Sequence, residues 1–142
     1  MATDTWAKNE AKSMGIVIHE PTPDGNDEYE YKETITIHYD YDSRNGENVP
    51  FPRRIDVDLN DRGSLYTETY YFDPGGSHDL ISMAVSYIEY GNPPESFTSF
   101  YFYNGEIIGN KVENGYALQP DAAKKRAAKM LTLFNALSAQ MH

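Results

Sequence analysis

The chain has 142 residues, 39% of them hydrophobic and 13% aromatic, which fits a single folded domain over residues 1–142. It carries a net charge of −10 and has no cysteine, which excludes disulfide bonds, thiol nucleophiles and cysteine-bound zinc. Because it has no signal-peptide pattern and no run of about 20 apolar residues, we expect a cytoplasmic protein that does not enter a membrane.

The charge is unevenly distributed. Residues 1–118 contain eight Lys and Arg against 21 Asp and Glu, a balance of −13, whereas residues 119–142 have a balance of +3. An acidic body repels nucleic acid and anionic membranes and attracts basic proteins. We therefore expect a basic protein partner and no direct contact with nucleic acid.

Most of the chain has the pattern of hairpins. Residues 28–42 alternate with a period of two, and a loop centred on Asn45-Gly46 leads to a second alternating segment, 51–60. A turn at 61–63 and the segment LYTETYYF follow, and FYFYNGEII places Asn104-Gly105 between two further extended segments. Alternation predicts strands that are buried on one face, and Asn-Gly predicts the turns between antiparallel strands.

Two other segments have apolar or polar residues at helical spacing. Residues 80–90 fit either a strand or a helix with Ser77 as N-cap and Gly91 after its end; we favour the strand for its β-branched and aromatic content. Residues 120–141 predict a helix that begins at Pro120 and has an apolar stripe. Residues 4–14 could be a short helix, 15–18 a short strand and 21–27 a loop. The expected fold is α+β, an antiparallel meander sheet packed by a C-terminal helix.

Two aspartate-rich segments raise the question of calcium. HYDYDSRNGEN contains Asp40 and Asp42, and DVDLNDRG contains Asp56 and Asp58. An EF-hand loop needs Gly at its sixth position and Glu at its twelfth. Counted from Asp40 these positions are Asn and Phe, and counted from Asp56 they are Asp and Thr. We expect no metal site and no cofactor.

No catalytic pattern stands out either. The four histidines have no i, i+3 or i, i+4 pairing, and the chain has neither GxSxG nor a Walker loop. DPGGSHD at 73–79 lacks the Lys of a phosphate loop, so we interpret it as a turn. His38 beside an aspartate on a strand face is usually plain surface. We therefore expect a protein that is not an enzyme.

The remaining feature is a predicted acidic sheet face. If the two aspartate-rich strands pair, their aspartates lie on one surface, where like charges cost stability unless solvent screens them or a cationic partner meets them. The candidate contact residues are Asp40, Asp42, Asp56, Asp58, Asp61 and Tyr39. Small acidic, cysteine-free, Tyr-rich domains include inhibitors and immunity proteins, although no motif here identifies a family.

We predict a non-catalytic acidic protein that inhibits or neutralises a basic protein, for example one that handles nucleic acid. One alternative is a half-open β-barrel that binds a small ligand in an aromatic cavity. Another is a structural or assembly subunit that pairs through an edge strand, for instance as a homodimer.

Overall fold

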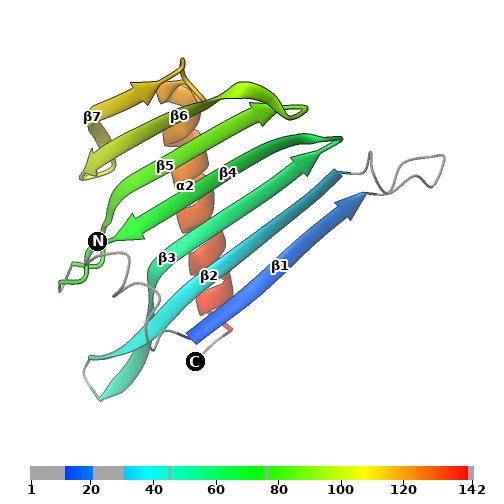
Figure 1. Ribbon diagram of the computed structural model, residues 1–142. Helices are drawn as coiled ribbons and strands as arrows, with labels where there is room; N and C mark the ends of the chain where they lie inside the picture. Colours follow the sequence, from blue (N-terminus) through cyan, green and yellow to red (C-terminus); the bar gives the residue numbers. More distant parts are fainter. Residues whose placement is uncertain (1–11, 21–30, 45, 76, 141–142) are drawn as a thin grey trace.

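The computed structural model describes residues 12–20, 31–44, 46–75 and 77–140. Its strands are β1 (Lys12–Glu20), β2 (Tyr31–Arg44), β3 (Glu47–Asp61), β4 (Ser64–Phe72), β5 (Leu80–Glu89), β6 (Asn92–Tyr103) and β7 (Glu106–Glu113), and its helix is α2 (Pro120–Ser138). Each strand pairs antiparallel with the next, so the seven-stranded sheet has the order β1 to β7 (Figure 1). The predicted α+β class, an antiparallel meander followed by one C-terminal helix, is confirmed.

Three of the connections are two-residue turns that end in glycine. They contain Arg62-Gly63, Tyr90-Gly91 and Asn104-Gly105, and both residues of each pair have positive φ. Such turns match the twist of antiparallel strands, and only glycine adopts this conformation without steric cost. Two of these turns were predicted. The segment 80–90 forms the favoured strand over residues 80–89, and Tyr90 and Gly91 belong to a hairpin turn, so Gly91 does not follow a helix.

The β2–β3 hairpin contains a bulge. His38 pairs with Arg54 and Tyr39 pairs with Pro52, which leaves Arg53 as the extra residue. A bulge disrupts the ladder locally and increases the twist of the hairpin. Prolines lack the N–H that a ladder needs, and here Pro50 and Pro52 both lie beyond the bulge. The aspartates on either side of it consequently belong to differently oriented parts of the hairpin.

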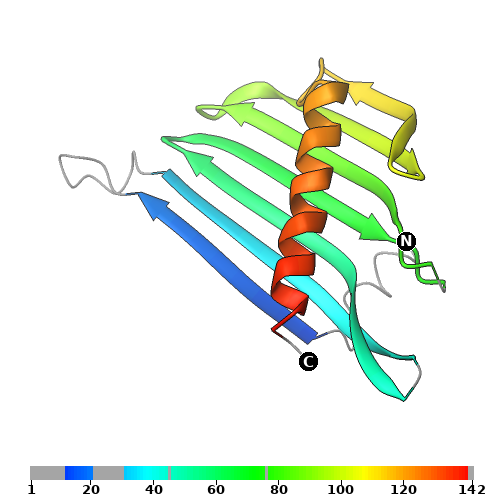
Figure 2. The same ribbon diagram turned by 180° about the vertical axis from the view of Figure 1, so that it is seen from behind.

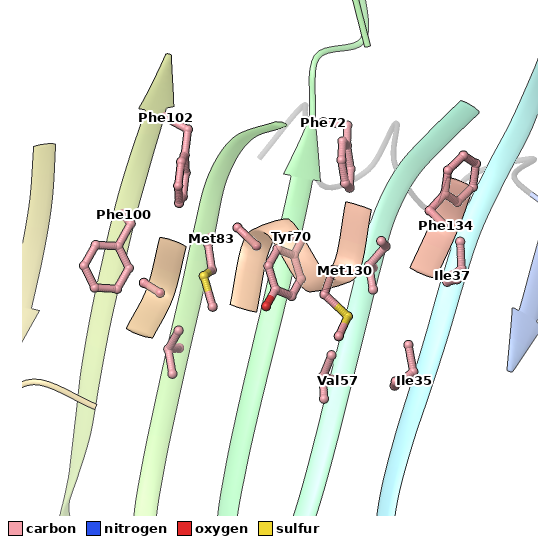
Figure 3. Close-up of a cluster of buried hydrophobic side chains, with 14 residues drawn as sticks. Ile35, Ile37, Val57, Tyr70, Phe72, Met83, Phe100, Phe102, Met130 and Phe134 are labelled. Atoms are coloured by element: carbon pink, nitrogen blue, oxygen red, sulfur yellow. The ribbon is translucent and has the colours of Figure 1, made fainter. Parts of the chain in front are cut away.

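Alternating side chains of the sheet form the core. One face contributes Ile35 and Ile37 of β2, Ile55 and Val57 of β3, Tyr70 and Phe72 of β4, Met83 and Val85 of β5, and Phe100 and Phe102 of β6 (Figure 3). Helix α2 lies obliquely across this face (Figure 2), and its buried residues are Ala123, Ala127, Met130 and Phe134. Apolar residues three and four positions apart form one stripe of a helix, and this stripe faces the sheet.

The helix begins as its sequence indicates. Pro120 is the first helical residue and Asp121 lies in the first turn, where a carboxylate complements the positive end of the helix dipole. Near the N-terminus, β1 includes the expected strand 15–18. The helix expected over 4–14 lies mostly outside the described residues, and its last three residues belong to β1. The loop expected at 21–27 also lies outside them.

Candidate functional site

The sheet face opposite α2, here called the bare face, is not covered by any part of the chain that the structure describes (Figure 1). Its centre carries short side chains, and larger ones stand beside them. The short ones are Thr67, Thr69, Ser82, Ala84, Ser86 and Ser99, and the larger ones are Leu65, Tyr71, Ile88, Phe97 and Tyr101. Leu65 is 49% exposed and lies directly opposite Ile88. The bare face is therefore a broad surface with hydroxyl groups and exposed rings.

Asp56 and Asp58 lie on the bare face, as predicted from the alternation. Asp56 accepts a hydrogen bond of 2.8 Å from Arg54 Nε and lies 3.2 Å from His38 Nε2. Asp58 is exposed and has no side-chain partner in the described part of the chain. His38 is thus oriented by Asp56 and not by its neighbour Asp40.

Asp40 and Asp42 lie beyond the bulge, and each contacts a side-chain nitrogen. Asp40 is 3.5 Å from Arg53 Nη1, and Asp42 is 3.3 Å from His78 Nε2. In the register, Asp40 is opposite Phe51 and Asp42 opposite Val49. The expected crowding of aspartates across the two strands was wrong, because threonines lie opposite Asp56 and Asp58 and the bulge separates the other two.

Tyr39 and Asp61, the last two predicted contact residues, belong to the helix side of the sheet. Tyr39 is partly buried against the core. Asp61 follows Leu59 by two positions, so both lie on the same side of strand β3, and Asp61 forms an exposed ion pair with Arg62. Neither residue extends the surface around Asp56.

A buried ionic cluster, here called the Arg126 cluster, joins α2 to the sheet. Arg126 donates two hydrogen bonds to Glu68, from Nε to Oε2 at 2.8 Å and from Nη2 to Oε1 at 2.9 Å. Tyr66 and Tyr70 donate their hydroxyl hydrogens to the same carboxylate at 2.6 and 2.7 Å. Glu68 is only 1% exposed, so these four donors replace the water that a buried carboxylate needs.

Glu33 is the second carboxylate of the Arg126 cluster. It is buried, accepts a hydrogen bond from the Tyr31 hydroxyl, and lies 3.6 Å from Arg126 Nη2. Burial and the neighbouring Glu68 carboxylate raise the pKa of Tyr66 and Tyr70, so both phenols remain protonated donors. Sequence reasoning missed this cluster. Its signal was available, since Glu33 and Glu68 each occupy a buried position in an alternating strand.

A pocket of about 390 Å³, here called the tyrosine pocket, lies near the β3–β4 and β5–β6 turns. Its lining residues are Leu59, Asp61, Arg62, Ser64, Tyr66, Tyr87 and Tyr90. None of them comes from α2, although Leu59, Tyr66 and Tyr87 share the helix side of the sheet with the core. Tyr66 also connects the pocket to the Arg126 cluster through its hydrogen bond to Glu68.

A second group of side chains gathers around His78. Its ring stacks on Phe51 at a centroid distance of 3.9 Å and an interplanar angle of 11°. Its Nδ1 is buried without a hydrogen-bond partner among the described residues. His78 lines a pocket of about 270 Å³ beside α2 together with Leu80, Phe102 and Leu131. The preceding residues form the predicted turn, in which Asp73 accepts hydrogen bonds from Gly75 N–H and Ser77 Oγ–H.

Among the described residues, no three His, Asp or Glu side chains lie close enough to hold a metal ion. Within the same ranges, no helix is both long and apolar enough to cross a membrane. No protein-family model, curated protein or solved structure matches this chain significantly.

Proposed function

We propose that this chain is a non-catalytic binding protein that covers and neutralises a basic protein through its bare face. The observation that carries the proposal is a seven-stranded sheet that, among the described residues, has a helix on one face only. The other face combines exposed aromatic rings with hydroxyl groups and aspartates. Tyrosine and other aromatic side chains are enriched at protein interfaces, where they contribute contact area at low entropic cost.

The charge of the whole chain supports a basic partner. The net charge is −10, whereas the charges on the bare face nearly balance, with Lys32, Arg54 and Lys111 against Asp56, Asp58 and Glu113. Long-range attraction therefore comes from the molecule as a whole, and the bare face would supply the specific contacts. Association should consequently weaken as the salt concentration rises, because added salt shortens the Debye length, which is about 8 Å at physiological ionic strength.

A matched pair of substitutions tests the proposal. Thr69 lies in the centre of the bare face, opposite Asp56 and Ala84, and Thr132 is exposed on α2. A partner is first recovered from native lysate at low and high salt and then purified. Thr69→Arg should weaken its binding at least about tenfold by placing a long side chain in the contact. Thr132→Arg makes the same change of charge away from that face and should weaken binding much less.

Equal effects of the two substitutions would exclude the bare face as the contact surface. Binding that does not change with salt would exclude charge-assisted recognition of a basic protein. Each variant's fold is checked by far-UV circular dichroism before its affinity is measured, so that a loss of binding is not a loss of structure.

The exposed edge strand favours assembly as a second candidate function. β7 is one edge of the sheet, and its Ile108 is 67% exposed. An unpaired edge with exposed apolar side chains can pair with another strand. If two copies associate through β7, Ile108→Lys should abolish a concentration-dependent dimer seen by analytical ultracentrifugation. A wild-type chain that stays monomeric at high concentration would exclude this candidate.

A further inference from the structure

Three tyrosine rings surround the tyrosine pocket. Tyr66 of β4 and Tyr87 of β5 are directly opposite in the register, so their side chains are neighbours on the helix side of the sheet. Tyr90 lies in the next turn, and a Cβ added at Gly63 would be only 3.4 Å from its Cδ1 atom. This distance corresponds to van der Waals contact, so the Tyr90 ring lies against the β3–β4 turn. Aromatic faces carry negative electrostatic potential and attract cations.

The charges near the pocket favour a cation as well. Asp61 lies on the pocket rim. Tyr66 also contacts the Arg126 cluster, which contains two carboxylates, Glu33 and Glu68, and only one guanidinium group. Arg62 also lines the pocket and pairs with Asp61, and because both side chains are about half exposed their opposite charges are screened alike and largely cancel. The remaining excess of negative charge comes from the second carboxylate of the Arg126 cluster.

The hydrogen-bond pattern narrows the ligand class. The Tyr66 hydroxyl donates to Glu68, and an Asp61 carboxylate oxygen already accepts from Arg62. These two hydrogen bonds occupy part of the polar capacity of the pocket, which suits an alkylated ammonium ion because it carries its charge with few or no N–H groups that need acceptors. Leu59 adds apolar contact area for an alkyl stem.

We propose that the tyrosine pocket binds an alkylated ammonium ion between the rings of Tyr66, Tyr87 and Tyr90. The site lies on the helix side of the sheet, so this proposal does not depend on the contact proposed for the bare face. The cation could belong to a free amine or to an alkylated lysine side chain, because both present the same group.

The probe is choline, and its neutral control is 3,3-dimethylbutan-1-ol, which has the same shape without the charge. Titration of the full chain followed by NMR chemical shifts should give saturable choline binding with a dissociation constant of about 1 mM, as expected for so small a ligand. The neutral isostere should bind at least about tenfold more weakly. A peptide with one trimethyl-lysine, compared with its unmodified form, then distinguishes the two sources of the cation.

We expect three charge variants on β3 and its turn to change choline binding in three different ways. Asp61→Asn should weaken choline binding, Arg62→Gln should strengthen it, and Asp58→Asn, with the same charge change on the bare face, should leave it unchanged. Tyr90→Leu should weaken it by roughly 2- to 30-fold, the range of cation–π contributions. These residues are exposed, so the variants should fold.

Three results would overturn the proposal. The first is the absence of saturable choline binding, and the second is equal affinity for choline and its neutral isostere. The third is an Asp58→Asn effect as large as that of Asp61→Asn, since the response would then report only the charge of the whole molecule.

Discussion

Removing Arg126 should destabilise the protein severely, because it leaves a buried charge uncompensated. Arg126 supplies two of the four hydrogen bonds to Glu68, whose side chain is shielded from water. Arg126→Met keeps the apolar stem but leaves the carboxylate with only the two tyrosine donors. Losing one partner of a buried ion pair costs about 3–5 kcal/mol, a large part of a typical domain's stability of roughly 5–15 kcal/mol.

A double-mutant cycle separates the interaction energy of the Arg126–Glu68 ion pair from the cost of disturbed packing. Glu68→Gln alone should cost about 1–3 kcal/mol, because its amide oxygen can still accept from one of the two tyrosines, which bond to different oxygens of Glu68, while Arg126 keeps Glu33 and some solvent. In the double variant neither Glu68 nor Arg126 leaves an unpaired charge, and Glu33 loses Arg126 as it already does in the single Arg126→Met variant. Its cost should fall below the sum of the single costs by about 2 kcal/mol or more. Urea unfolding followed by far-UV circular dichroism measures all three free energies.

The same helix offers a matched control. Lys124 donates a 2.7 Å hydrogen bond to Glu106, but these side chains are 41% and 70% exposed. Lys124→Met should therefore cost no more than about 1 kcal/mol, as for other surface ion pairs. The reasoning about burial is refuted if Arg126→Met costs as little as this control, or if the two cluster substitutions are simply additive.

Three further predictions concern the rest of the fold. Burial and the Glu68 carboxylate raise the pKa of Tyr70 above 10, so the stabilisation that Tyr70 contributes should be constant below about pH 10 and then fall by roughly 1.4 kcal/mol per pH unit, because this phenol ionises only in the unfolded chain. Tyr70→Phe should make the loss of stability above pH 10 less steep, and Tyr66, whose pKa is raised in the same way, should account for part of the fall that remains. Phe134→Ala should cost about 3–5 kcal/mol by leaving a cavity under α2, and a wild-type melting curve would contradict its burial; exposed Asn135→Ala is the control. Asp56→Asn should cost about 1 kcal/mol, because its amide oxygen can still accept from Arg54 but the ion pair is lost, whereas Asp58→Asn should stay within about 0.5 kcal/mol. A stabilising effect of Asp56→Asn would instead indicate repulsion between neighbouring aspartates, which the register contradicts.

The sequence by itself determined the local structure, because strand alternation and turn chemistry are properties of neighbouring residues. The period of two in β2 and β3 predicted both strands, and Asn104-Gly105 predicted a hairpin turn. Pro120 marked the start of α2 in the same way. The side of the sheet on which Asp56 and Asp58 lie also followed from alternation alone.

Only the tertiary structure decided which of these residues meet. The bulge at Arg53 separates Asp40 and Asp42 from Asp56 and Asp58, and a pattern within one strand does not show where its partner gains a residue. The contact of Arg126 with Glu68 joins residues 58 positions apart, and the oblique course of α2 across the sheet determines that contact. The tyrosine pocket likewise depends on the pairing of β4 with β5 and on a turn that brings Tyr90 close to Gly63, since pairing and turn together place side chains that no local spacing connects.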